Sequence, residues 1–204
     1  MPITGLSFLL FALAAVVLYY LFPKRLRQYV LLAASILFYL TYGVRMAGYL
    51  AATILLTYLF GLWLDRLAAF RPAAETKEER KRQKRANDRK KRRVLALSLV
   101  LNFASLALLK YGGFLAAAVN SVLGTELPLP HFLLPLGISF YIFQTSAYLI
   151  DISRGKHRAE RGFLRYALFV CYFPQLVQGP INRFADLQPQ LTEGNDFSWD
   201  NIQH

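Results

Sequence analysis

The sequence predicts an all-α integral membrane protein, a polytopic helix bundle of about five spans followed by a broken or re-entrant sixth segment. Two observations support this prediction. Of the 204 residues, 55% are hydrophobic and 15% aromatic, and these residues form long blocks instead of alternating with polar ones. The net charge is +12, and the charged residues are concentrated in short stretches between the blocks, as in the loops of membrane proteins.

The predicted spans are apolar runs separated by charged, glycine-rich or proline-rich turns. They cover residues 5–22, 29–43, 46–64, 94–111 and 131–150. The first run is interpreted as a retained span and not as a signal peptide, because no Lys or Arg precedes Lys24 and no small-residue cleavage site follows. The sixth run, 163–181, contains Pro174, Gly179 and Pro180, which interrupt a regular helix.

Positive charge alternates along the chain, which predicts the side of the membrane on which each loop lies. The loops after the first, third and fifth runs are rich in Lys and Arg, whereas those between them carry only the single charges Arg45 and Lys110. We therefore expect a multi-pass protein of the cell membrane, with its amino terminus outside and the basic loop 66–93 in the cytoplasm.

Within that loop, residues 76–93 are predicted to form a basic cytoplasmic helix that continues into the fourth span. Thr76 and Glu79 have the spacing of a capping box, and Glu78 lies four residues before Arg82. Basic runs of this kind also occur in nucleic-acid-binding proteins. A solvated extension that contacts anionic membrane lipids is the preferred interpretation, and no nucleic acid is expected as a partner.

The fifth run has a polar stripe. Its members recur at steps of four, three, four and three, which places them on one face of a helix: Gly137, Tyr141, Gln144, Tyr148 and Asp151. Such a face must contact protein or a water-filled cavity, because lipid cannot satisfy its polar groups. Gln144, Tyr148 and Asp151 are therefore candidate cavity-lining residues, with Arg154 as the expected partner of Asp151. The alternative is hydrogen bonding that only holds the helices together.

The broken sixth segment contributes the other candidates. Gln175 and Gln178 are polar at membrane depth, where irregular backbone is tolerated only if it is buried in protein or lines a cavity. We predict that both line the same cavity, and a purely structural re-entrant turn is the alternative. Arg183 follows the segment and is predicted to hold a phosphate or carboxylate of a donor, since its planar guanidinium suits such groups.

Other kinds of site lack the residues that they need. The three histidines, His131, His157 and His204, are too far apart in sequence to resemble a set of metal ligands. The chain has no glycine-rich phosphate-binding or dinucleotide-binding motif. We therefore expect no metal and no cofactor, and we assign no catalytic residue. The single cysteine, Cys171, is predicted to be a small buried apolar residue.

Two long motifs occur in the second half of the chain. The first is residues 134–144 (LPLGISFYIFQ), continued by 148–151 (YLID), and the second is residues 173–181 (FPQLVQGPI), followed by Arg183. Together with 19–23 (YYLFP) they resemble the bacterial branch of the membrane-bound O-acyltransferase family, in which alginate and teichoic acid are acylated. The resemblance extends over nearly the whole chain.

The resemblance implies an acyltransferase. An acyl group such as acetyl or D-alanyl would pass from a donor, a thioester or acyl carrier, to a hydroxyl of an extracytoplasmic cell-envelope polysaccharide or other polymer, directly or through a partner acyltransferase. It also implies a histidine general base downstream of residue 204. Residues 1–204 are thus expected to be the amino-terminal portion of one membrane domain, inactive alone. The alternatives are a membrane transporter, which also has broken helices, and a non-catalytic membrane scaffold.

Overall fold

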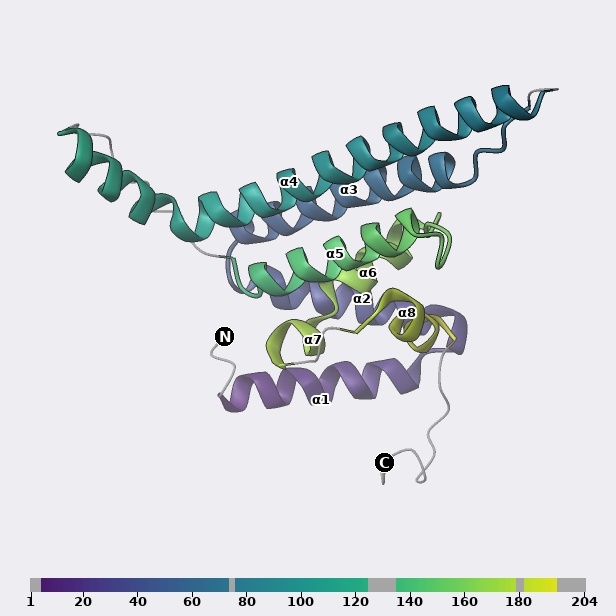
Figure 1. Ribbon diagram of the computed structural model, residues 1–204. Coiled ribbons are helices and arrows are strands. Elements are labelled where there is room, and N and C mark those ends of the chain that lie inside the picture. Colours follow the sequence, from purple (N-terminus) through teal and green to yellow (C-terminus); the bar gives the residue numbers. More distant parts are fainter. Residues whose placement is uncertain (1–4, 74–75, 125–134, 179–181, 194–204) are drawn as a thin grey trace.

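The computed structural model describes residues 5–73, 76–124, 135–178 and 182–193, and every regular element in these ranges is a helix. Figure 1 shows the helices, which are α1 (Leu6–Leu21), α2 (Lys24–Leu40), α3 (Val44–Ala68), α4 (Lys77–Leu123), α5 (Ile138–Ser153), α6 (Phe163–Cys171), α7 (Phe173–Gln178) and α8 (Phe184–Thr192). Helix α3 packs against α4 and α5, and helix α2 packs against α1, α3 and α6. The all-α class is thus confirmed for the described residues.

Helix α2 begins earlier than the predicted run 29–43. Pro23 has extended backbone torsions, with φ −62° and ψ 150°, and the helix starts at the next residue. Lys24, Arg25 and Arg27, predicted to form a turn, therefore lie at the beginning of α2. Proline fixes φ at a helical value and lacks an N–H, so it is well suited to a position at the start of a helix.

Helix α4 is continuous from the basic segment into the apolar one, as predicted for residues 76–93 and 94–111. It extends further, to Leu123, and ends at Gly124, whose φ of 61° is in the left-handed region that favours glycine. Thr76 is the residue before the helix, but its side chain makes no capping hydrogen bond. Figure 1 shows the amino-terminal part of α4 projecting beyond the end of α3.

The helices differ in their capacity to cross a membrane. By length and composition, α3 and residues Lys77–Phe114 of α4 are long and apolar enough, and α1 is a shorter apolar helix. Helices α1, α2 and α5 have 16, 17 and 16 residues. At about 1.5 Å per residue they measure about 24–26 Å, short of a hydrocarbon core of about 30 Å. The predicted number of spans therefore stays a prediction.

The main core lies between α2, α3, α5 and α6, and it includes Leu64, Leu149 and Ile152, which have no exposed surface. A second hydrophobic cluster packs α1 against α2 and α7. In it the ring centroid of Phe11 lies 5.9 Å from that of Phe38 and 5.4 Å from that of Phe173. Such aromatic pairs add to the burial of apolar surface.

The basic segments gather at one end of the bundle. Figure 1 shows that the turn between α1 and α2, the loop between α3 and α4 and the loop between α5 and α6 all lie at the same end. Lys and Arg are frequent in or directly after these connections: at the start of α2, in the first part of α4 and in the loop between α5 and α6. We call this region the basic end. Here Asn87 Nδ2 donates a hydrogen bond of 2.8 Å to the carbonyl oxygen of Leu67, which links α4 to the end of α3.

Candidate functional site

The predicted sixth segment consists of two short helices, α6 and α7, separated by a break at Tyr172. This residue has φ −53° and ψ 107°, outside the helical region. Pro174 is the second residue of α7, where a helix leaves its N–H groups without partners in any case. The proline therefore begins a new helix, and the break precedes it by two residues.

Two side chains from other helices satisfy the backbone groups that the break separates. In a continuous helix the N–H of Phe173 would bond to the carbonyl of Phe169. Instead, the Phe173 N–H donates to Ser35 Oγ of α2 at 3.2 Å, and the Phe169 oxygen accepts from Gln144 Nε2 of α5 at 3.1 Å. We call this arrangement of Ser35, Gln144 and the α6–α7 break the junction.

The two motifs of the sequence meet at the junction. Gln144 Nε2 also donates to Gln175 Oε1 of α7 at 3.2 Å. Gln144 is 1% exposed and Gln175 is 5% exposed, so both amides are buried in protein. Gln144 Oε1 is buried as well, and among the described residues it has no hydrogen-bond partner. Tyr141, another member of the α5 stripe, is fully buried too.

Tyr148 belongs to a second polar group, centred on Glu160. The Tyr148 hydroxyl accepts a hydrogen bond of 2.9 Å from the backbone N–H of Glu160. The Glu160 carboxylate accepts from the Gly162 N–H at 2.8 Å and from Gln188 Nε2 at 3.1 Å. The ring of Phe184 packs 4.9 Å from that of Tyr148. These contacts hold α8 against α5 and the loop that precedes α6.

The other candidates have separate surroundings. Asp151 Oδ1 forms an ion pair of 2.9 Å with Lys156 Nζ, so the prediction of Arg154 as the partner of Asp151 was wrong. Arg183 precedes α8, its carbonyl accepts the N–H groups of Asp186 and Leu187, and its side chain is exposed. The side chain of Gln178 lies outside the described residues. Their role as cavity-lining residues stays a prediction.

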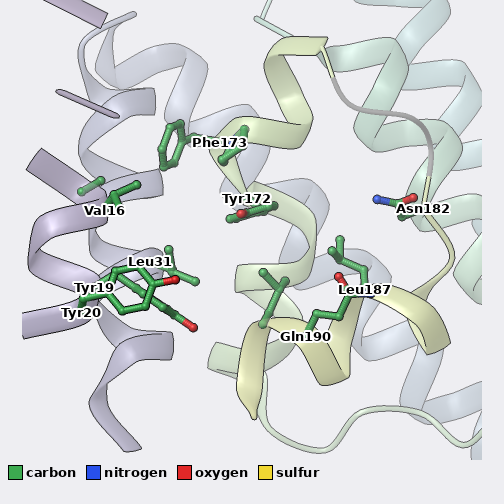
Figure 2. Close-up of a pocket in the computed structure, with 12 residues that line it drawn as sticks. Val16, Tyr19, Tyr20, Leu31, Tyr172, Phe173, Asn182, Leu187 and Gln190 are labelled. Atoms are coloured by element: carbon green, nitrogen blue, oxygen red, sulfur yellow. The ribbon is translucent and has the colours of Figure 1, made fainter. Parts of the chain in front are cut away.

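A cavity of about 480 Å³ lies beside the junction, and we call it the α1–α8 cavity. Figure 2 shows Tyr19 and Tyr20 of α1 on one side, Leu187 and Gln190 of α8 on the other, and Tyr172 between them. The rest of its described lining is Ala15, Val16, Leu31, Phe173, Pro174, Asn182 and Leu191. A mainly apolar wall with a few polar groups is typical of small-molecule sites.

Ser35 and Gln144 help to shape this cavity without belonging to its described lining. Gln144, Tyr148, Asp151, Gln175 and Arg183 are not part of its described lining. The residues at the break, Tyr172 to Pro174, do line it, and Ser35 and Gln144 hold the break in place. Of the candidates from the sequence, Gln144 and Gln175 thus support the break that forms part of this wall.

The sequence reasoning missed Ser35 and Glu160. Ser35 is the only serine in the apolar run 29–43, and in a span a hydroxyl group must find a hydrogen-bond partner. Glu160 is the only acidic residue in a loop with five Lys and Arg residues between 154 and 165, which marks it as a local partner. Cys171 is buried, as predicted. Within the described ranges, no three His, Cys, Asp or Glu residues are grouped as metal ligands.

Comparison with known proteins identifies relatives of this chain. It is 34% identical over 178 residues to a probable alginate O-acetylase of Azotobacter vinelandii, and 36% identical over 178 residues to that of Pseudomonas putida. Each match covers 85% of this chain, and 32% and 33% of those relatives. A peptidoglycan O-acetyltransferase of Helicobacter pylori is 30% identical over 200 residues, which are 86% of this chain and 34% of that protein.

The chain thus spans about a third of the length of the curated relatives it matches. No protein-family model and no solved structure matches it. Over the matched part, this chain is related to bacterial O-acetyltransferases, and its resemblance to the membrane-bound O-acyltransferase family is confirmed.

Proposed function

We propose that this chain is part of a membrane-bound O-acyltransferase that transfers an acyl group, such as acetyl, to a hydroxyl of a cell-envelope polysaccharide or related polymer. The similarity to O-acetyltransferases named for alginate and for peptidoglycan is the observation that carries the proposal. The partners would be an acyl donor, a thioester or acyl carrier, and an extracytoplasmic polymer or partner acyltransferase.

Within such an enzyme, the residues described above would position groups and not transfer protons. Ser35, Gln144 and Gln175 would fix the break between α6 and α7, and the break would form one wall of the α1–α8 cavity. Tyr148 and Glu160 would hold α8, which forms the opposite wall. Tyr20 and Gln190, which line the cavity, are exposed, and a donor would enter past them.

An exchange of segments between relatives tests this function. Residues 1–204 replace the matching segment of the Pseudomonas putida probable alginate O-acetylase in a strain that lacks that protein, and ester-bound acetate on alginate is measured. We expect the chimera to restore acetylation, and the 204-residue chain alone to restore none, since it matches about a third of the relative. A chimera present in the membrane at the wild-type amount that yields no ester would contradict the proposal.

We further propose five spans and a broken sixth, with the amino terminus outside and the basic end in the cytoplasm. The proposed spans are 5–22, 29–43, 46–64, 94–111 and 131–150, with 163–181 as the broken segment and 76–93 as a cytoplasmic helix. The gathering of the basic segments at one end supports this orientation, because Lys and Arg are enriched on the cytoplasmic side of membrane proteins.

Cysteine accessibility is expected to distinguish the two ends of the bundle. In a C171A background, T41C lies in the turn between α2 and α3 and A73C lies after α3, and both positions are exposed. A membrane-impermeant maleimide should label T41C in intact spheroplasts, and should label A73C only after the membrane is permeabilised. The cysteine-free C171A chain is the control. Labelling of A73C in intact spheroplasts, with T41C protected, would show the opposite orientation.

A further inference from the structure

A groove runs along the outside of the bundle between α2, α3 and α6, away from the α1–α8 cavity. It consists of two adjoining parts that share Leu32, Phe163 and Leu164 in their linings. The part nearer the basic end has a volume of about 340 Å³. The part further along α2, which reaches Tyr39 and which we call the deeper part, has a volume of about 260 Å³. Because the same side chains line both parts, we treat them as one α2–α6 groove.

The two parts differ in chemistry. The part near the basic end contains Arg165, Gln28 and the backbone at Gly162, whereas the described lining of the deeper part is almost entirely aliphatic or aromatic. Neither part has an Asp or Glu in its described lining. The groove therefore has a cationic end and an apolar end, as an amphipathic ligand requires.

The cationic end is arranged to receive an anion. A Cβ atom at Gly162 would lie 3.2 Å from Glu160 Oε1 and 3.4 Å from Arg165 Cδ. The aliphatic stem of the arginine therefore packs over the glycine, whose N–H is already bonded to the Glu160 carboxylate, while the Arg165 side chain stays exposed. Among the described residues, Arg165 has no ion-pair or hydrogen-bond partner. The Gln28 Oε1 atom is buried and lacks a hydrogen-bond partner in the described chain.

The length of the groove matches one leaflet of a bilayer. Gln28 lines its cationic end and Tyr39 lines its apolar end, eleven residues further along α2. At about 1.5 Å per residue this is about 16 Å, close to half of a hydrocarbon core of about 30 Å. Leu164 and Ile36 remain 49% and 47% exposed, so the groove opens sideways, toward the membrane of a bundle oriented as proposed above.

We propose that the α2–α6 groove binds one anionic phospholipid of the leaflet at the basic end. The phosphate lies at Arg165, and one acyl chain follows Leu32 and Ile36 toward Tyr39. Guanidinium groups form strong charge-assisted hydrogen bonds with phosphate, which gives the site its preference for such lipids. The site requires a membrane-embedded bundle but not acyl transfer, so it would hold even if the chain had no part in catalysis.

Native mass spectrometry of the detergent-purified chain tests the site, with dioleoyl phosphatidylglycerol and dioleoyl phosphatidylcholine as probes. We expect one phosphatidylglycerol to bind per chain in preference to phosphatidylcholine. Arg165→Gln should weaken phosphatidylglycerol binding by about tenfold and leave phosphatidylcholine binding unchanged, since it removes one charge-assisted contact. Arg154→Gln is the matched control, because Arg154 is exposed at the same end and does not line the groove.

Filling the apolar part tests the acyl-chain position separately. Ala51→Phe adds a ring to the groove lining, whereas Ala52→Phe adds the same ring to the neighbouring exposed residue of α3, which does not line the groove. Ala51→Phe should weaken both lipids, and Ala52→Phe should behave as the unmodified chain. Circular dichroism confirms that each variant is folded. Equal binding of the two lipids by the unmodified chain, or equal binding by the two phenylalanine variants, would overturn the proposal.

Discussion

Replacing Gln144 with leucine is expected to lower the free energy of unfolding by about 1–3 kcal/mol, because it leaves the Phe169 carbonyl at the helix break without its side-chain donor. The variant removes the donor to the Phe169 carbonyl and the donor to Gln175 Oε1. Leucine is close in size to glutamine, so the loss of hydrogen bonds outweighs any change in packing. Interhelical hydrogen bonds in membranes often contribute less than 1 kcal/mol, but here a backbone carbonyl at a helix break loses its partner as well.

The other side of the junction gives the matched comparison. Ser35→Ala removes the acceptor of the Phe173 N–H and should also destabilise the chain by about 1–3 kcal/mol. Ser98 is the control, since it too has no exposed surface but donates only within its own helix, to the Leu95 carbonyl at 2.8 Å. Ser98→Ala should therefore change stability by less than about 0.5 kcal/mol.

Titration with sodium dodecyl sulfate in mixed micelles, followed by circular dichroism, measures these changes. If the two junction groups stabilise one break, the Ser35→Ala/Gln144→Leu double variant should be destabilised by less than the sum of its parts, because once the break relaxes its remaining contacts are already weakened. Ser35→Ala and Ser98→Ala variants of equal stability would show that the break needs no side-chain partner from α2.

The features that the sequence predicted well are local. The α5 stripe follows from the spacing of polar residues along one helix, and Tyr141, Gln144 and Tyr148 are indeed buried. The continuity of α4 follows from the absence of Pro and Gly between its charged and apolar parts. The broken sixth segment follows from Pro174, although the exact register of the break depends on which position of a new helix the proline occupies.

Partners distant in sequence could not be predicted in this way. Gln144 lies 31 residues from Gln175, and Ser35 lies 138 residues from Phe173. The spacing of polar residues along a helix indicates that these side chains need hydrogen-bond partners. Which groups serve as partners depends on how the helices pack. A serine in a span can bond to its own helix alone, as Ser98 does, or to another segment as well, as Ser35 does.

The partner of Asp151 shows that even a short-range prediction depends on backbone geometry. Arg154 is three residues away, but α5 ends there, and Gly155 turns the chain back with a φ of 73°. The Lys156 N–H then bonds to the Asp151 carbonyl and the Gly155 N–H to that of Ile152, the pattern of a Schellman motif. This turn brings the Lys156 ammonium to the Asp151 carboxylate, and Lys156 therefore replaces Arg154 as its partner.

Gly61→Ala is expected to destabilise the chain by about 1–3 kcal/mol, because α3 and α5 pack too closely at this glycine to admit a methyl group without a shift. The added carbon would lie 3.0 Å from Tyr148 Cε1 and 3.5 Å from Ile152 Cδ1, and both side chains are fully buried. Tyr148 has little freedom to move, since its hydroxyl accepts the Glu160 N–H and its ring packs against Phe184. Small residues allow membrane helices to approach each other in this way.

Gly48 provides a control on the same helix. Nothing lies within 4 Å of a Cβ placed there, so Gly48→Ala should stabilise α3 by up to about 1 kcal/mol through its higher helix propensity. The two substitutions are chemically identical and should change the midpoint of detergent unfolding in opposite directions. If Gly61→Ala stabilised the chain as much as Gly48→Ala, the close contact between α3 and Tyr148 would be refuted. The contact of α3 would then not restrict Tyr148, and α3 would have no part in positioning the Glu160 loop and α8 through Tyr148.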